Sequence, residues 1–544
     1  MIVGMLMSEE AKRQLLFEAL TRHNYFPNQR EGVGELPPCF STRQFTPEVV
    51  ESLAQLHDGK ERTNGYDLVE YRATRYNNVP RVLGLVHPLA YARLAKCVFE
   101  HWDEFEAVSN NEKSIIKPEL HNDGRLLVMN YEDPTTKLTR GHIVGFGKRF
   151  RVHADIANCF NSIYTHSIPW AVIGVVEAKK KENQKKSQWF NSLDLHQRKC
   201  KRGETQGIPV GSATSSIIVE LILSKIDERL SQRGYEHYRY VDDYTCYCKT
   251  DEEAQRFIRD LGDFLGDYKL TLNLKKTHIE VLPAASEDSW VLELRSSLPS
   301  RLAYESEDAK PLTTAEAVTF FNRAITVNQS TPDGSVLKYA FLVVREFLSE
   351  DAARHSLDLL LNLAWHYPIL IPLIDGYLDT LSLSADVYEA QLNILISENA
   401  EQRRTDGMVW PMHIMHKHGI HCAADAGDKI VESGDCAAMT LLLEMGTHNN
   451  KILEFADGVI SSDLYDKDAQ WLLLYQLYFK GLIEDPYGDG VFRRLKNYRV
   501  NFIPGDSETN SEKRCKELVE KFEDEAMRRA FGTVAELPKQ EAEF

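Results

Sequence analysis

The feature of this chain that most limits its fold is a pair of adjacent acidic residues inside a β-forming run. Residues 238–248 place aromatic, β-branched and cysteine residues on both sides of Asp242 and Asp243. This pattern predicts a β-hairpin with two carboxylates at its tip. Neighbouring carboxylates repel each other unless a cation neutralises them, and Mg²⁺ prefers such oxygen ligands. A solvent-exposed Asp-Asp turn would have the same sequence, so the pair alone leaves both interpretations open.

A third acidic residue ends another predicted strand upstream. Residues 150–156 form a β-rich run that contains Asp155 and leads into a helix-like turn. One carboxylate from this strand, with one or two from the hairpin, could hold two Mg²⁺ ions. Two-metal sites activate an attacking hydroxyl and stabilise the leaving oxygens in nucleotidyl transfer. Asp155 alone does not indicate a function. Together, the strand that contains it and the acidic hairpin downstream indicate a two-metal site for nucleotidyl transfer.

Four segments around these residues resemble the palm of a reverse transcriptase. Asp155–Phe160 is similar to motif A, Gln206–Gly211 with Ser215 to motif B, Tyr240–Asp243 to the YxDD of motif C, and Leu270–Thr277 to motif D. The motifs stand in the order of an unpermuted right-hand polymerase, and the resemblance covers roughly residues 75–285. It implies an α+β right-hand polymerase of the reverse transcriptase type, with fingers and palm, that uses dNTPs.

The resemblance also implies roles for individual residues. Asp155 and Asp242 would be ligands of two Mg²⁺ ions, with Asp243 as the neighbouring acid and the Ile156 carbonyl as a further metal contact. Lys276 would stand near the leaving pyrophosphate as a general acid or a charge clamp. A solvated lysine at the end of a strand is the alternative for that residue.

Further residues are candidates for binding the nucleotide. The resemblance places Phe160 beneath the incoming sugar, where a ring leaves no room for a 2′-hydroxyl; a core phenylalanine is the alternative. Gln206 and Gly207 would let the backbone approach the nucleotide or template closely, which a Cβ would block. A basic run before motif A could grip a triphosphate or form a solvated face. It consists of Lys148, Arg149 and Arg151.

A basic segment lies between motifs A and B. Residues 179–204 contain nine basic and three acidic residues, with Trp189 and Phe190 among them. Basic residues interleaved with aromatic ones suit a phosphate backbone and unstacked bases, although a solubilising loop has a similar composition. The candidate nucleic-acid-binding residues are Lys179, Lys180, Lys181, Lys185, Lys186, Arg198, Lys199, Lys201 and Arg202.

Two short segments narrow the resemblance to one branch. Tyr164–Ala171, and Leu193-Asp194 with Arg198, are similar to the bacterial abortive-infection and defence-associated reverse transcriptases, which also append a helical domain. This implies a role in antiphage defence. A retron- or group II intron-like enzyme of a mobile element is the alternative within the polymerases. A catalytically silent, RNA-binding sensor is the second alternative, and the intact acidic residues count against it.

Patterning divides the chain into four parts. Residues 1–56 are expected to be a helical extension, 57–285 the fingers and palm, 286–312 a linker, and 313–544 an all-α, HEAT-like domain, because apolar residues recur there at helical spacing. The predicted fingers and palm, residues 57–285, contain five predicted strand regions. They are Val82–Val86, Arg125–Met129, Phe150–Ile156, Tyr238–Tyr247 and Lys269–Leu274.

Charge is distributed unevenly between these parts. The chain has a net charge of −17, and residues 301–544, with 24 basic and 40 acidic residues, account for −16. A template is therefore not expected along the C-terminal surface. The exception is the basic stretch 493–499, which together with Tyr498 and Phe502 is the part of this domain expected to face nucleic acid.

The cysteines and apolar stretches bear on compartment and partners. Nine cysteines without a CxxC pair argue against a disulfide framework and favour a reducing, cytoplasmic location. The most apolar stretch, residues 359–378, is interrupted by proline and polar residues, so no membrane anchor is expected. The expected partners are dNTPs, a noncoding RNA and the DNA product, with a homo-oligomer or a complex with a second defence protein.

Overall fold

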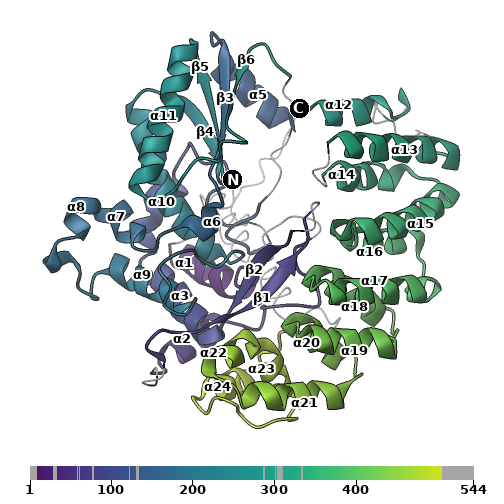
Figure 1. Ribbon diagram of the computed structural model, residues 1–544. Coiled ribbons are helices and arrows are strands. Elements are labelled where there is room, and N and C mark those ends of the chain that lie inside the picture. Colours follow the sequence, from purple (N-terminus) through teal and green to yellow (C-terminus); the bar gives the residue numbers. More distant parts are fainter. Residues whose placement is uncertain are drawn as a thin grey trace, which may run out of the picture.

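The computed structural model describes residues 9–27, 34–57, 59, 62–75, 79–121, 123–129, 134–285, 288–300, 302, 310–331 and 335–504. A mixed α/β body is followed by a long array of helices that curves around and returns to that body (Figure 1). Within the described ranges, no helix is both long and apolar enough to cross a membrane.

The N-terminal part combines short helices with a two-stranded antiparallel sheet. Strand β1 (Leu68–Ala73) pairs with β2 (Arg81–Val86). Helix α2 begins after Thr46, whose hydroxyl accepts a hydrogen bond from the Val49 amide, a typical N-cap. The helices of this part are α1 (Glu9–Glu18), η2 (Ala19–His23), α2 (Pro47–Ala54), α3 (Pro88–Glu100), η4 (Trp102–Phe105), α4 (Glu106–Ser109) and α5 (Pro134–Gly145).

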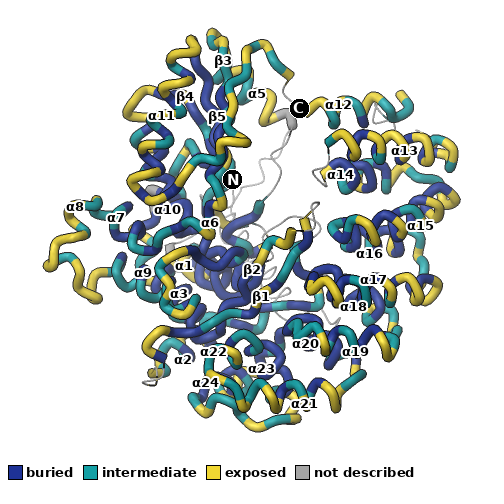
Figure 2. The backbone as a smooth tube through the Cα atoms, in the orientation of Figure 1, coloured by how far each residue is buried: buried dark blue, intermediate teal, exposed yellow. Residues whose placement is uncertain are grey.

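The second sheet has four antiparallel strands in the order β4-β5-β3-β6. Its strands are β3 (Phe150–Asp155), β4 (Glu236–Tyr240), β5 (Asp243–Cys248) and β6 (His278–Val281). Helices α10 (Ala213–Gln232) and α11 (Asp251–Asp267) contact this sheet, and both contain buried apolar residues (Figure 2). The C-terminal end of β3 and the start of β5, the two central strands, lie side by side at one end of the sheet.

Five helical segments connect β3 to α10. They are α6 (Cys159–Ser162), α7 (Ser167–Ile173), α8 (Val175–Ala178), η5 (Lys181–Asn183) and α9 (Trp189–Lys199). Of these, α6 directly follows the β3 strand, whereas α8 lies at the outer edge of the molecule in Figure 1.

Two of the predicted strands are not strands. At 125–129, Leu126 and Leu127 are buried, but their backbone groups bind the side chain of Asn24: the Leu126 amide donates to Asn24 Oδ1 at 2.7 Å and Asn24 Nδ2 donates to the Leu127 carbonyl. At 269–274 the chain makes only an isolated bridge between Ile156 and Leu272. In the first of these segments, the Asn24 side chain supplies some of the backbone partners that a neighbouring strand would have supplied, and the amides of Glu119 and His121 donate to the carbonyls of Leu126 and Arg125.

The predicted linker 286–312 contains a helix. Helix α12 (Ser289–Ser296) packs against the helical array: the rings of Trp290 and Tyr339 lie 5.6 Å apart, and Arg295 Nε donates to the Tyr339 hydroxyl at 3.0 Å. Residues 289–296 thus belong to the array, which corrects the linker prediction there. Residues 286, 287, 301 and 303–309 lie outside the described residues.

Helices follow one another from Thr313 to Asn497, as the apolar spacing predicted. Helix α13 begins at a capping box formed by Thr313 and Glu316. The helices are α13 (Thr314–Ser330), α14 (Ser335–Val344), η7 (Arg345–Phe347), α15 (Glu350–His366), η8 (Pro368–Leu370), α16 (Pro372–Leu381), η9 (Ala385–Tyr388), α17 (Glu389–Glu401), α18 (Thr405–Lys417), α19 (Ala424–Ser433), α20 (Cys436–Glu444), α21 (Asn449–Ile460), α22 (Leu464–Ala469), α23 (Trp471–Phe479) and α24 (Val491–Asn497). A HEAT-like organisation stays a prediction, and residues 505–544 lie outside the described part.

The end of the array returns to the first sheet and the N-terminal helices. Helices α18, α20, α22 and α23 contact β1, and α24 contacts α2. Phe502 is fully buried and packs on Phe26, and Arg494 donates to the hydroxyl of Ser52. The expectation that the 493–502 stretch faces nucleic acid is therefore wrong for these two residues, because the tertiary fold uses them to dock the array.

Candidate active site

Three acidic residues occupy neighbouring positions where β3 ends and β5 begins. Asp155, the last residue of β3, lies directly opposite Asp243, the first residue of β5, and the two strands are hydrogen-bonded neighbours. Asp242 lies in the two-residue turn between β4 and β5, and its carbonyl accepts a hydrogen bond from the Ile156 amide at 3.2 Å. The predicted hairpin with carboxylates at its tip is confirmed, and Asp155 is adjacent to that tip.

The pKa values of Asp242 and Asp243 are raised by their burial and by the acidic residues beside them. Partial burial, and then the charges of Asp242 and Asp155, raise the pKa of Asp243 to about 7. Burial and the charge of Asp155 likewise raise the pKa of Asp242 above its usual range. Burial and mutual repulsion therefore both disfavour full ionisation of Asp242 and Asp243.

Two residues of the predicted motif D bind Asp155. Asn273 Nδ2 donates to Asp155 Oδ1 at 2.9 Å, and Lys276 Nζ lies 2.9 Å from Oδ2. The Asn273 amide also donates to the Asp155 carbonyl, which fixes the two segments together. The hydrogen bond to Asp155 raises the pKa of Lys276, although most of that side chain is exposed. Lys276 thus lies beside one of the predicted metal ligands, its role at the pyrophosphate stays a prediction, and no role was predicted for Asn273.

The donor set fits a divalent cation in its chemistry. Across the described ranges, no three His, Cys, Asp or Glu side chains are gathered closely enough to hold a metal ion, and both carboxylate oxygens of Asp155 accept hydrogen bonds. However, carboxylate oxygens are the hard ligands that Mg²⁺ prefers, and a cation would oppose both the burial and the mutual repulsion that raise the pKa values of Asp242 and Asp243.

The turn between β4 and β5 has a strained backbone, and a buried arginine binds it. Val241 has a φ of 55°, which is rare for a β-branched residue. Its carbonyl accepts a hydrogen bond at 2.7 Å from Nη1 of Arg239, a fully buried residue that also binds Glu220 and Asp227 on α10. Sequence analysis did not identify Arg239, because an arginine in a β-forming run gives no sign of being buried.

The predicted glycine loop of motif B packs against α6. Gly207 has a φ of 79°, and a Cβ there would lie 3.1 Å from the Asn161 carbonyl. Gln206 Nε2 donates to the Ser162 carbonyl, and the Ile208 amide donates to the carbonyl of Phe160. The structure therefore brings Gln206, Gly207 and the half-buried Phe160 together, immediately beyond the strand that carries Asp155.

The basic run before β3 lies away from the carboxylates. Arg151 lies near the start of β3, roughly 13 Å from Asp155 at about 3.3 Å per residue, and Lys148 and Arg149 precede that strand. Arg151 is paired with Glu280 at 2.6 Å, and Lys148 with Glu236 at 3.1 Å. These contacts do not favour the predicted grip on a triphosphate.

A different arginine acts on the site. The charge of Arg81, the first residue of β2, opposes the rise in the pKa of Asp242. Sequence analysis missed Arg81, because its influence on Asp242 arises only when the first sheet packs near the second.

The predicted nucleic-acid-binding residues fall into two groups. The five lysines between 179 and 186 are exposed just after α8, on η5 and in the segment that follows; of these, Lys180 is paired with Glu177 at 2.7 Å and Lys179 lies over the ring of Trp170. By contrast, Arg198 and Lys201 are paired with Asp194 and Glu204, while Arg202 lies over the ring of Tyr465. Lys199 is half-buried at the end of α9.

The aromatic residues of the basic segment belong to the core. Phe190 is buried, and the indole of Trp189 stacks on His101 at 5.9 Å and meets Phe105 edge-on at 5.6 Å. They are therefore not platforms on which bases could stack, which corrects that part of the prediction.

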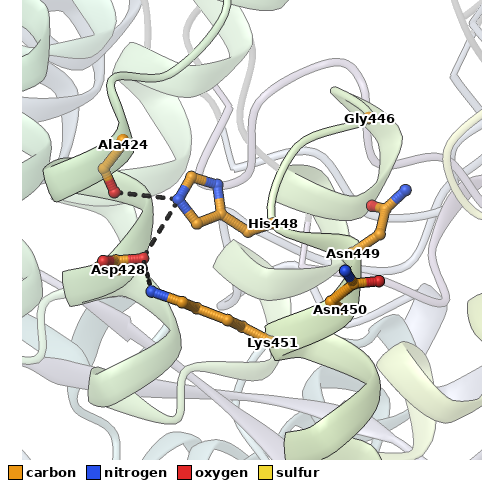
Figure 3. Close-up of a pocket in the computed structure, with 7 residues that line it drawn as sticks. All are labelled: Ala424, Asp428, Gly446, His448, Asn449, Asn450 and Lys451. Carbon is orange, nitrogen blue, oxygen red and sulfur yellow. Dashed lines mark hydrogen bonds and ion pairs between the residues drawn. The ribbon is translucent and has the colours of Figure 1, made fainter.

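A pocket of about 380 Å³ lies elsewhere, between α19 and α21 (Figure 3). Asp428 binds Lys451 at 2.6 Å and His448 at 3.3 Å, while His448 Nε2 also contacts the Ala424 carbonyl. Its charged groups are thus bound to one another. These contacts join two helices of the array, far along the chain from the carboxylates.

Comparison with known protein families finds a match that includes the three acidic residues. Residues 128–316 match the family described as "Reverse transcriptase (RNA-dependent DNA polymerase)". The matched range includes the three carboxylates, the glycine loop and Lys276. A search among curated proteins found no match.

Several solved telomerase structures are similar to this chain at low identity. Apo telomerase from Candida tropicalis truncated from its C-terminal domain is 12% identical, with 45% of this chain and 57% of that chain covered and a TM-score of 0.29. Telomerase from Candida albicans in complex with a fragment of telomeric RNA is 12% identical, with 67% and 69% covered and a TM-score of 0.26. The corresponding RNA complex from Candida tropicalis is 10% identical, with 74% and 68% covered and a TM-score of 0.30. The chain thus spans little more than half of the first of these proteins.

Proposed function

Because this chain contains a reverse transcriptase domain, which is a nucleotidyltransferase, we propose that it is an RNA-directed or template-independent DNA polymerase that extends a hydroxyl with dNTPs. The observation that carries the proposal is the direct pairing of Asp155 with Asp243, with Asp242 in the adjoining turn. The end of β3, the β4–β5 turn and the start of β5 place Asp155, Asp242 and Asp243 at one end of the sheet. Nucleotidyl transfer requires an acidic cluster of this kind.

The proposed metal ligands are the carboxylates of Asp155, Asp242 and Asp243 and the Ile156 carbonyl, for two Mg²⁺ ions. When bound, the metal supplies Lewis-acid activation of the attacking hydroxyl and neutralises charge on the phosphates. Lys276 has an exposed side chain whose ammonium group already lies beside Asp155. From there it can move to the leaving pyrophosphate and donate a proton or a balancing charge.

The nucleotide is proposed to lie between the glycine loop and the first sheet. Phe160 would lie beneath the sugar and exclude a 2′-hydroxyl, while Gln206 and Gly207 would line the approach of the base or template. Arg81 is a further candidate for the triphosphate: it is paired with Glu35 at 3.2 Å, as Lys148 and Arg151 are with their acids, but its charge also opposes the rise in the pKa of Asp242.

Replacing the carboxylates tests this proposal. We expect Asp242→Asn and Asp155→Asn to lower dNTP incorporation on the order of 10³-fold, because charge stabilisation at the reacting phosphate is lost. The melting temperature of the Asp242→Asn protein should be unchanged or higher, since this substitution relieves repulsion. Asp263→Asn, at an exposed position on α11, is the matched control. Wild-type incorporation by a folded Asp242→Asn protein would overturn the assignment.

We further propose that the polymerase acts in antiphage defence. The two segments that carry the resemblance to defence-associated enzymes are in contact: His166 Nδ1 lies 2.8 Å from Asp194 Oδ2, and Arg198 Nε donates to Oδ1 at 3.2 Å. Phage plating on cells that express the wild type or Asp242→Asn tests this role. Protection by both proteins would favour the silent sensor, and sequencing the nucleic acid that co-purifies would reveal a retron- or intron-like enzyme.

A further inference from the structure

We propose that Arg239 is a positioning residue for the polymerase site: its buried guanidinium holds the strained turn at Val241 and so keeps Asp242 beside Asp155. Arg239 contacts the backbone of the turn, at the Val241 carbonyl. It rests on the proposed function for its activity measurement only.

The turn needs support because of its backbone conformation. Val241 lies in the left-handed region, with a φ of 55°, and two heavy atoms on its Cβ make that region unfavourable. Such conformations persist only where the surroundings impose them. Two hydrogen bonds do so here: Arg239 Nη1 donates to the Val241 carbonyl at 2.7 Å, and the Ile156 amide donates to the Asp242 carbonyl at 3.2 Å.

Arg239 is itself fixed from two directions. Its guanidinium binds both oxygens of Glu220, at 2.7 and 2.8 Å, and Asp227 at 2.8 Å. These two acids are seven residues apart on α10 and therefore share one face of that helix. The backbone of Arg239 is bonded to Lys113 and Ile115 as well. A rigid connection thus runs from the long helix behind the sheet to the acidic turn.

The chemistry of this cluster requires arginine. Burial favours the neutral form of Asp227, but Arg239 and His237 hold its pKa well below its usual range, so the buried pair remains ionised. Buried ion pairs are weak contributors to stability, and apolar residues can replace them. A guanidinium, however, presents five N–H groups in a fixed fork and can serve Glu220, Asp227 and the Val241 carbonyl together, which an ammonium group on a flexible stem cannot.

A double-mutant cycle separates positioning from general stability. The variants are Arg239→Lys, Val241→Gly and the double variant. Arg22→Lys is the matched control, because Arg22 is also buried, binds the carboxylate of Glu18 and donates to the carbonyl of Arg43. Each protein is measured for kcat and KM in primer extension, for melting temperature, and for hydrogen exchange of the peptide that covers 236–248.

We expect Arg239→Lys to lower kcat by about 10²-fold with little change in KM, as a small displacement of a reacting group does. Exchange should increase at the turn while the rest of the protein stays protected. Val241→Gly should recover much of this loss in the double variant, because glycine adopts the left-handed region without strain. Arg22→Lys should leave kcat and the exchange of 236–248 unchanged.

The proposal is overturned by an unchanged kcat in Arg239→Lys, by losses that simply add in the double variant, or by unchanged exchange at the turn. If Arg239→Lys does not fold, the variant Arg239→Met/Glu220→Gln/Asp227→Asn removes all three charges together and is judged by the same measurements. A wild-type protein that incorporates no dNTP would instead refute the polymerase assignment, and the exchange measurement would still decide the role of Arg239.

Discussion

Among single residues, Asp155 connects the largest number of parts of the candidate site. It is paired with Asp243 in register, and its two carboxylate oxygens accept hydrogen bonds from Asn273 and Lys276. Lys276 therefore balances one negative charge where a cation would otherwise do so. Burial, and then the charges of Asp242 and Asp155, raise the pKa of Asp243 to about 7.

This pKa predicts a pH-dependent difference in stability. The unfolded chain releases the Asp243 proton near pH 3.9, whereas the folded protein keeps it up to about pH 7, so this group destabilises the fold progressively between those values. Asp243→Asn should melt with the wild type at pH 4 but roughly 1–2 °C higher at pH 8. Added Mg²⁺ should narrow the difference at pH 8, because it neutralises the wild-type carboxylate.

Thermal melts at both pH values, with Asp263→Asn as the control, check this expectation. A variant that melts below the wild type at pH 8 would contradict it.

Among the elements, the first sheet depends most on its neighbours. β1 pairs with β2 on one edge only, and two strands alone are marginally stable. On the other edge, the amide of Arg72 donates to Thr405 Oγ1 at 3.0 Å, and that of Thr74 donates to Asp406 Oδ2 at 2.7 Å. The first turn of α18 thus takes the place of a third strand. The helical array thereby holds the sheet that carries Arg81.

Removing this contact should affect the sheet and the nucleotide together. Asp406→Ala leaves the amide and hydroxyl of Thr74 without their acceptor, at a cost of about 1–3 kcal/mol in unfolding free energy. We expect faster hydrogen exchange in 68–86 and a larger change in KM for dNTP than in kcat. Asp358→Ala, which removes a contact to Tyr388 within the array, is the control. Unchanged exchange in 68–86 would refute the dependence of the sheet on α18.

At the scale of the whole molecule, the end of the described chain packs on its beginning. The Ser41 amide donates to the Phe502 carbonyl at 2.9 Å, and Trp471 Nε1 donates to the Leu85 carbonyl at 2.9 Å. The acidic array is therefore an integral part of the enzyme body. The exposed lysines around α8 lie on the side of the molecule away from the array in Figure 1, which leaves them the better surface for a polyanion.

Charge reversal tests this surface. Lys181→Glu/Lys185→Glu/Lys186→Glu should weaken RNA binding more at low salt than at high salt, and should reduce the slope of log K against log salt by roughly 2 for a single strand. Lys417→Glu/Lys429→Glu/Lys451→Glu makes the same charge change on the array, at lysines paired with acids, and should have a smaller effect. Equal losses in fluorescence-anisotropy titrations would indicate long-range charge alone and contradict a contact surface.

The sequence by itself determined the local elements that matter most. The acidic hairpin, the strand ending at Asp155 and the helices beyond Thr313 could be predicted, because each follows from periodicity or turn chemistry within a short window. Lys276 could be found from the motif in which it stands. The distance of Lys148 and Arg151 from Asp155 also follows from the sequence, because an extended segment of several residues separates them from it.

Only the tertiary structure decided the rest. Asn273 binds Asp155 across 118 residues, Arg239 binds an acid 19 residues away on the far side of a sheet, and Arg62 binds Asp468 across 406 residues. Contacts between such distant positions leave no periodic signal in the sequence. They form because buried polar and charged groups must find partners, and only the packed fold determines which groups are buried together.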